Sequence, residues 1–200
     1  MYRFRIKNLI PLSFLVIVVG ISACEGKSPF SCDAFNETIL STFPTTDTEP
    51  KTIRMWINTH YITATPSLKE GTDTLGRTWF YWSINQSDYR ATVSKEGSGL
   101  NVYLTGKKPS LKDVVGCLGK PGFYEARVLP PTDTGFLTQV GLWYPVRKLY
   151  VSSTESGSNL VVNDSTPFDR ISILDTESVR QMKLRPWPAD LTDIHVEPWP

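Results

Sequence analysis

The sequence predicts an α+β fold in which an antiparallel sheet carries helices on one face, built from two related α-then-β units. Two segments place apolar residues at helical spacing, and several others alternate with the period of two that is typical of strands. Their order is helix, strands, helix, strands, and the helical segments lie about 58 residues apart, counted from Ile53 to Leu111. Layering such helices on one side of the sheet would bury the apolar faces of both.

The first unit is predicted over residues 48–108. A helix should begin near Pro50, because proline suits a first helical turn, and Ile53, Trp56 and Ile57 follow on one helical face. Aromatic and β-branched residues then alternate between short turn sequences. This pattern predicts strands over residues 77–84, 89–94 and 100–105.

The second unit is predicted over residues 109–184. Ser110 with Asp113 three residues later is typical of a helix start, and Gly119 followed by Pro121 is typical of a helix end. Period-two segments after this helix predict strands over residues 123–129, 138–144, 148–153 and 170–174. Residues 185–200 form a tail that is too rich in proline for regular structure.

Residues 1–23 have the layout of a secretory signal peptide. A basic stretch with Arg3, Arg5 and Lys7 precedes an apolar stretch and then small residues. The apolar stretch is roughly a dozen residues long, whereas a membrane-spanning helix needs about 20. We therefore expect the leader to be removed rather than kept as an anchor.

The residues before Cys24 carry a second signal. Ile21-Ser-Ala-Cys24 resembles the lipobox of bacterial lipoproteins, in which small residues precede the cysteine that receives lipid. The resemblance implies a chain anchored through acylated Cys24 to the cell membrane or outer envelope, on the extracytoplasmic side, with residues 24–47 as tether. Isolated apolar residues in this segment, such as Phe35 and Leu40, indicate a short helix near residues 33–41. Two alternatives stay open: plain secretion after cleavage at Ala23, and an uncleaved anchor.

The other cysteines, Cys32 and Cys117, allow two interpretations. An even pair in an oxidising compartment can form a disulfide that ties the tether to the folded domain. Alternatively, Cys117 is a small buried apolar residue on its helix and Cys32 has no structural role. The sequence leaves both open.

The charge balance argues against nucleic-acid binding. The leader holds three of the 21 basic residues and none of the 20 acidic ones, so the rest of the chain carries 18 basic and 20 acidic residues, a net charge of −2. Nucleic-acid binding depends largely on neutralising phosphates with clustered Lys and Arg. We expect no nucleic-acid partner.

Recognisable catalytic or metal-binding patterns are not found in the sequence. His60 lies in the last turn of the first predicted helix and His195 in a short polar segment, where packing or capping roles are the simpler interpretation. The loop acids Asp164, Asp169, Asp175 and Glu177 lack the spacing of a calcium loop. We therefore predict no catalytic residue, no metal and no cofactor.

One further segment resembles known proteins. Residues 110–122, Ser-Leu-Lys-Asp-Val-Val-Gly-Cys-Leu-Gly-Lys-Pro-Gly, are followed by the aromatic run Leu142-Trp-Tyr-Pro145. This pair of segments is similar to the helix-then-hairpin motif of small outer-membrane lipoproteins of the β-barrel assembly machinery and of the β-lactamase inhibitor protein. The chain also resembles uncharacterised bacterial lipoproteins over more of its length, including the helix around Trp56 and the Pro-Trp-Pro ending. The resemblance implies a protein that presents a sheet or loops to another macromolecule.

These observations predict a lipid-anchored envelope protein with a non-catalytic macromolecule-binding or assembly role and a protein partner in the envelope. The first alternative is a lipoprotein that binds a glycan or small ligand, for which the proline-flanked Trp187 and Trp199 are the candidate aromatic surface. The second alternative is a hydrolase whose acid pair has no recognisable pattern.

Overall fold

The computed structural model describes residues 31–35, 37–61, 67–85, 87–133, 135–157, 161–174 and 176–198. The predicted signal peptide and Cys24 lie outside the described residues, as does Trp199. Among the helices within these ranges, none is long and apolar enough to cross a bilayer.

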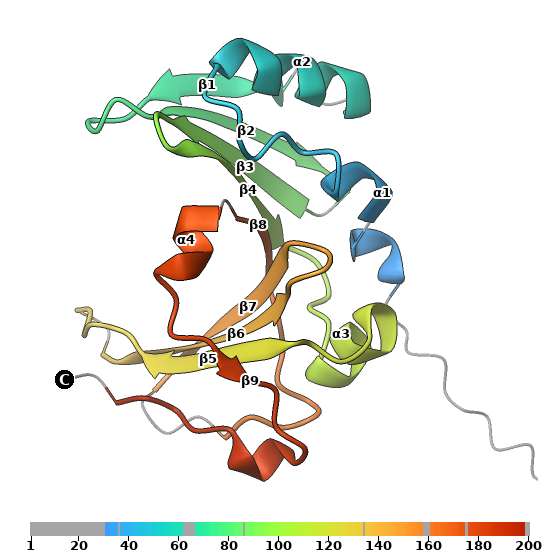
Figure 1. The fold of residues 1–200 in the computed structure, drawn as a ribbon, viewed down its shortest axis with the longest axis vertical. Coiled ribbons are helices and arrows are strands. Elements are labelled where there is room, and N and C mark those ends of the chain that lie inside the picture. The colour runs from blue at the N-terminus through green and yellow to red at the C-terminus, as the bar shows by residue number, and fades with distance from the viewer. Residues whose placement is uncertain are drawn as a thin grey trace, which may run out of the picture.

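Strands dominate the described fold (Figure 1). The strands are β1 (Lys69–Thr72), β2 (Thr78–Ile84), β3 (Ser87–Ser94), β4 (Gly97–Leu104), β5 (Phe123–Val128), β6 (Leu137–Tyr144), β7 (Leu149–Ser156), β8 (Arg170–Ile173) and β9 (Arg185–Pro186). The helices are η1 (Cys32–Phe35), α1 (Glu37–Leu40), α2 (Pro50–His60), α3 (Leu111–Leu118), α4 (Thr176–Arg180) and η3 (Leu191–Asp193). All strands belong to one antiparallel sheet of order β1-β2-β3-β4-β8-β7-β6-β5-β9.

The predicted α+β class, with helices layered on one face of two α-then-β units, is wrong. The fold is mostly a nine-stranded antiparallel sheet, and its four described α-helices are short, the longest having 11 residues. Strand β8 pairs with both β4 and β7, so strands from the two predicted units share one sheet. Helix α4 has no counterpart among the predicted elements and lies on the face opposite α3 (Figure 1), where Ser178 of α4 lines a pocket with Asn101 of β4. Helical periodicity over eight to eleven residues correctly located α2 and α3 but overstated their share of the fold.

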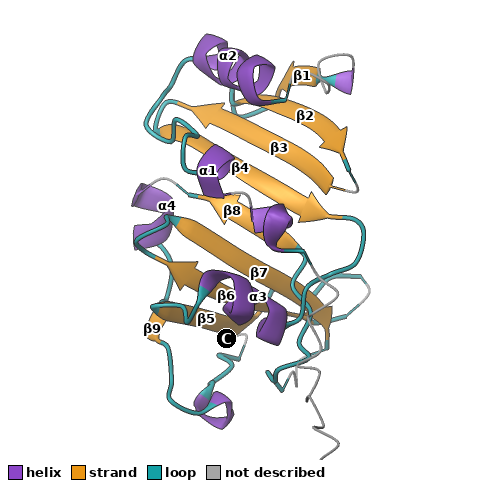
Figure 2. Cartoon of the chain, turned by 90° about the vertical axis from the view of Figure 1, so that its right-hand side faces the viewer, coloured by secondary structure: helices purple, strands orange, loops and turns teal. Residues whose placement is uncertain are grey.

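One face of the sheet is apolar and packs against helices. Buried residues of α2 and α3, including Ile53, Trp56 and Val114, join the same core as sheet residues such as Phe80 and Leu142. Figure 2 shows α1 and α3 in front of the sheet on this side. We call it the core face.

Helix α3 starts and ends as the sequence predicts. The Ser110 hydroxyl accepts a hydrogen bond from the Asp113 backbone N–H, and the Asp113 carboxylate accepts one from the Ser110 N–H. This reciprocal pair satisfies two backbone donors that the first helical turn leaves unpaired. At the other end Gly119 adopts a φ of +77°, which residues with a side chain rarely adopt.

A disulfide joins the start of the described chain to α3. Cys32 of η1 and Cys117 of α3 are bonded, with their Cα atoms 5.5 Å apart and a sequence separation of 85. The structure therefore agrees with the first of the two interpretations that the sequence left open, a disulfide between Cys32 and Cys117. It closes a long loop that includes α2 and the strands β1–β4.

Removing this disulfide should destabilise the domain. In the soluble Cys24→Ser background, the double substitution Cys32→Ser and Cys117→Ser should lower the free energy of unfolding by about 2–4 kcal/mol, because the unfolded chain regains loop entropy. Urea unfolding followed by tryptophan fluorescence measures this difference. Reductant should lower the stability of the disulfide-bonded protein and leave that of the double variant unchanged. Equal free energies of unfolding for the two proteins without reductant would contradict the expectation.

Candidate functional site: the polar face of the sheet

The second face of the sheet is lined by polar and aromatic side chains, and we call it the polar face. Its rows follow from the strand register, because residues directly opposite one another on paired strands share a face. One row is Ser83, Asp88, Tyr103, Arg170, Ser152, Gly141 and Glu125. The neighbouring row is Tyr81, Arg90, Asn101, Ser172, Tyr150, Trp143 and Phe123.

The polar face has an exposed half and a buried half. On β2–β4, Arg90 is exposed, Tyr103 is 37% exposed, and Tyr81 and Asn101 are half-buried. On β5–β8, Glu125, Ser152 and Tyr150 are all buried. Helix α4 and the chain that leads from it to β9 lie on this side of the sheet (Figure 1).

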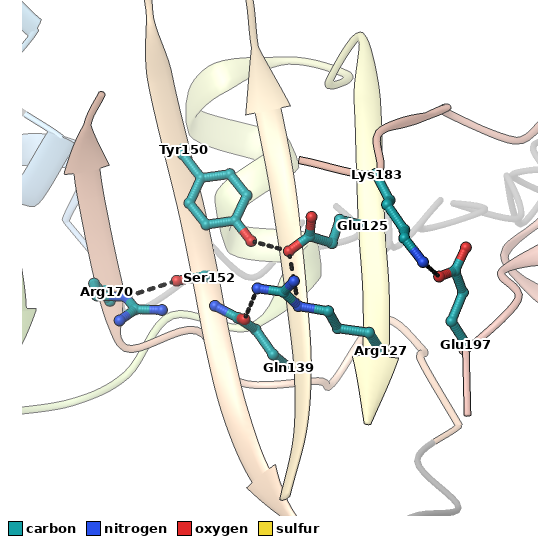
Figure 3. Close-up of polar contacts among 8 residues, drawn as sticks. All are labelled: Glu125, Arg127, Gln139, Tyr150, Ser152, Arg170, Lys183 and Glu197. Atoms are coloured by element: carbon teal, nitrogen blue, oxygen red, sulfur yellow. Dashed lines mark hydrogen bonds and ion pairs between the residues drawn. The ribbon is translucent and has the colours of Figure 1, made fainter. Parts of the chain in front are cut away.

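Glu125 is the central group of the buried half (Figure 3). Its side chain is 2% exposed, and its Oε1 atom accepts a hydrogen bond from the Tyr150 hydroxyl at 3.3 Å. The same oxygen lies 3.4 Å from Nε of Arg127, whose guanidinium also donates to Gln139. Oε2 of Glu125 has no hydrogen-bond partner among the described residues. A buried carboxylate with one unpaired oxygen depends strongly on the remaining two contacts.

A glycine makes the Tyr150–Glu125 contact possible. Gly141 lies between them in the register, and a Cβ atom at this position would lie only 1.9 Å from the Tyr150 hydroxyl oxygen. The tyrosine ring therefore lies across the bare backbone of β6 and reaches the next strand. On β2, Trp79 lies over Gly71 of β1 in the same manner. Each half of the polar face thus holds an aromatic ring packed over a strand glycine.

Hydrogen bonds across β8 link the two halves. The Ser172 hydroxyl donates to Oδ1 of Asn101 at 2.7 Å on the exposed side. Nε of Arg170 donates to the Ser152 hydroxyl at 2.9 Å on the buried side. Strand β8 therefore bonds through one side chain to the exposed half and through another to the buried half.

The C-terminal segment closes the far edge of the sheet. The backbone N–H of Val128 on β5 donates to the carbonyl of Glu197, and the Glu197 carboxylate accepts ion pairs from Arg185 at 3.0 Å and Lys183 at 3.3 Å. Hydrogen bonds from Arg185 and then Lys183 hold the pKa of the Glu197 carboxyl below its usual range. The predicted irregular tail thus includes the short strand β9 and lies along β5.

Burial affects the ionisation of several tyrosines. Burial is the largest cause that raises the pKa of Tyr150, and the nearby negative charge of Glu125 raises it further. Burial also raises the pKa of Tyr144 and of Tyr61 and Tyr89, whose rings pack 5.0 Å apart beneath the end of α2. All four hydroxyls stay protonated through the neutral range.

The structure separates the predicted aromatic surface from the polar face. Trp187 is half-buried and packs against the core, with its ring edge-on to Tyr124 at a centroid distance of 6.3 Å. Trp199 lies outside the described residues. The described chain therefore supports a packing role for Trp187 and leaves the binding role of this pair as a prediction.

The two histidines are placed apart. The ring of His60 bonds through Nδ1 to the Trp56 carbonyl at 2.9 Å and lies 3.4 Å from the Thr42 hydroxyl through Nε2. His195 is exposed, and its backbone N–H donates to the Tyr124 hydroxyl. These contacts are those of packed or surface residues.

The loop acids do not gather around a common point in the described chain. Asp169 forms an ion pair with Lys108 at 3.0 Å, and the backbone carbonyl of Asp164 accepts from Lys112 N–H. Asp175 and the side chain of Glu177 lie outside the described part. Within the described residues, no group of three His, Cys, Asp or Glu side chains is arranged to hold a metal ion.

A shallow pocket adjoins the exposed half of the polar face. It has a volume of about 280 Å³ and lies between β3, β4 and the region of α4, with Thr92, Gly99, Asn101 and Ser178 among its lining residues. Pockets for small-molecule ligands usually have volumes of about 300–1,000 Å³ and are largely apolar. This pocket is small and polar by that standard.

Comparison of the chain with protein-family models, curated proteins and solved structures gives no match. The resemblance to the assembly lipoproteins and the inhibitor protein therefore stays a prediction from residues 110–122 and 142–145, which the structure places in α3, just before β5 and at the end of β6.

The polar face is not among the sites predicted from the sequence. Trp79, Tyr81 and Ser83 alternate with apolar residues, and the next two strands show a similar alternation, so the signal for an exposed sheet surface was present in the sequence. The register that aligns these strands depends on pairing between distant segments, which alternation does not specify.

Substituting Gly141 with alanine should disrupt the buried half. The new methyl group would displace the Tyr150 ring from its contact with Glu125, so we expect the free energy of unfolding to fall by about 1–3 kcal/mol. Gly116→Ala in α3 is the matched control, because a Cβ atom there meets nothing within 4 Å. The control should be neutral or stabilising by up to about 1 kcal/mol. Equal losses in both variants, measured by urea unfolding, would contradict this packing.

The buried tyrosines predict a loss of stability at alkaline pH. Tyrosines in the unfolded chain lose their protons near the ordinary pKa of 10.0, while those in the folded protein still hold them. The stabilising contribution is therefore complete below about pH 9 and is lost as the pH rises past 10. Urea unfolding over this range should show a falling free energy, with a shallower fall in Tyr150→Phe. A free energy of unfolding that stays constant up to about pH 11 would contradict the raised pKa of these tyrosines.

Proposed function

We propose that this chain is an envelope protein, anchored by lipid on Cys24, that binds a macromolecular partner through the exposed half of the polar face and performs no chemistry. The observation that carries the proposal is the open surface of β2–β4, where Tyr81, Arg90, Asn101 and Tyr103 face away from the core.

The residue types on this surface favour a protein partner. Tyrosine, tryptophan and arginine contribute most to binding in protein interfaces, because each supplies a large contact area together with a polar group. The strands hold these residues in fixed rows, and the neighbouring Asn101 side chain is held by a hydrogen bond from Ser172. Side chains that are already ordered lose little entropy when a partner binds.

The shape of the surface favours a macromolecule over a small ligand. The exposed half is a sheet surface, and the pocket beside it is small and lined mostly by polar groups. A glycan or small molecule usually requires a deeper hollow that buries most of its surface. The resemblance of residues 110–122 to partner-binding lipoproteins agrees with this proposal.

Substitutions on the exposed half should remove the partner. Tagged full-length protein is extracted gently from its own membranes, and co-purifying proteins are quantified. The double variant Arg90→Ala and Tyr103→Ala should lower the recovery of a stoichiometric partner at least tenfold, because each side chain is expected to contribute about 1 kcal/mol or more. A Cys24→Ser variant should lose membrane association.

The matched control is Lys51→Ala with Met55→Ala on α2, both exposed on the opposite side of the sheet. This pair should leave partner recovery unchanged. Equal recovery with the polar-face variant and the wild type would refute the proposed surface. A protein that is extracted alone, with its fold intact by circular dichroism, would refute partner binding itself.

A further inference from the structure

The disulfide restricts how far the domain can move from the proposed anchor. Seven residues lie between Cys24 and Cys32. The eight residue-to-residue steps that join the two cysteines span at most about 28 Å when the chain is fully extended. Cys32 is bonded to Cys117 of α3. If Cys24 carries lipid, as proposed above, the end of α3 is held within about 30 Å of the bilayer surface.

The turn between β6 and β7 lies at this end of the domain. The Tyr144 hydroxyl donates to the Gly119 carbonyl at 3.2 Å, just after α3, and Pro145 packs against Gly122. On its other side, Val146 lines a hollow of about 680 Å³ with Leu40 of α1. The turn therefore lies beside both helices that flank the disulfide.

The turn exposes an apolar side chain next to basic ones. Val146 is 96% exposed, which is the largest exposed fraction among the exposed large apolar residues of the described chain. Lys148 is exposed in the same turn, Arg147 is half-buried, and Lys120 is exposed between Gly119 and Gly122, which the turn contacts. An exposed apolar residue with basic residues near it matches the boundary between acyl chains and anionic headgroups.

We propose that the turn Pro145–Lys148 contacts an anionic phospholipid bilayer, with Val146 inserted at the headgroup level and Lys120 and Lys148 beside lipid phosphates. One valine and a few basic residues bind weakly on their own. A short tether, however, gives an effective concentration in the millimolar range, which makes a weak contact sufficient. The proposal rests on the lipid anchor of the proposed function.

This contact orients the domain. Helices α1 and α3 lie on the core-face side, and α4 lies on the other side (Figure 1). With the turn and α3 toward the bilayer, the exposed half of the polar face points away from it. The surface proposed to bind a partner then stays accessible.

Hydrogen exchange on lipid vesicles tests the contact. Full-length lipidated protein is reconstituted into vesicles of phosphatidylethanolamine and phosphatidylglycerol, and its exchange is compared with that of soluble Cys24→Ser protein in the same buffer. Peptides that cover residues 145–149 should exchange at least fivefold more slowly in the anchored protein. Val146→Asp should abolish this slowing without releasing the protein from vesicles, whereas Met55→Asp on α2 should leave it intact.

The outcomes separate the two proposals. Mass spectrometry that shows no lipid on Cys24 would overturn the anchor and this contact together. Lipid on Cys24 with unchanged exchange in the turn would overturn the contact alone. Equal slowing on vesicles of phosphatidylcholine only would overturn the role assigned to the anionic headgroups.

Discussion

The position of β8 between β4 and β7 is the constraint on which the rest of the structure depends. Four residues, Arg170–Ile173, pair on both sides. Without them, β4 and β7 would each expose a row of unpaired backbone groups at a sheet edge. With them, Val102, Ile171 and Val151 form one continuous apolar row, so the core beneath α2 joins the core beneath α3. One short strand thus turns two groups of strands into a single folded unit.

The same strand produces the polar face. Because side chains alternate along a strand, fixing Ile171 in the core directs Arg170 and Ser172 to the other side. Both then bond across to neighbouring strands, to Ser152 and Asn101. The exposed tyrosine and arginine side chains are therefore part of a surface whose geometry is set by the core. This is the form of preorganisation that reduces the entropic cost of binding.

How much the sequence predicts depends on the range of the interaction involved. The capping box of α3 is local, and its helix begins and ends where the sequence indicates. Seven strands lie within three residues of the predicted ranges, since alternation is also local. Strand β1, Lys-Glu-Gly-Thr, has no apolar alternation because it is an edge strand, and it was not predicted. The placement of β8 and the Tyr150–Gly141–Glu125 arrangement depend on register between distant segments, which no local pattern specifies.

The disulfide connects the fold to the proposed anchor in a way that neither feature provides alone. Phe35, Leu40 and Phe43 are buried in the shared core, so packing already holds the chain that follows Cys32. The covalent bond extends this restraint to Cys32 and leaves seven residues between it and Cys24. If Cys24 carries lipid, a tether of this length keeps the domain close to the bilayer, which would raise the effective concentration of the polar face toward partners in the same membrane. Because Cys32 is bonded to α3, on the other side of the sheet, an anchor at Cys24 would not compete with a partner for the polar face.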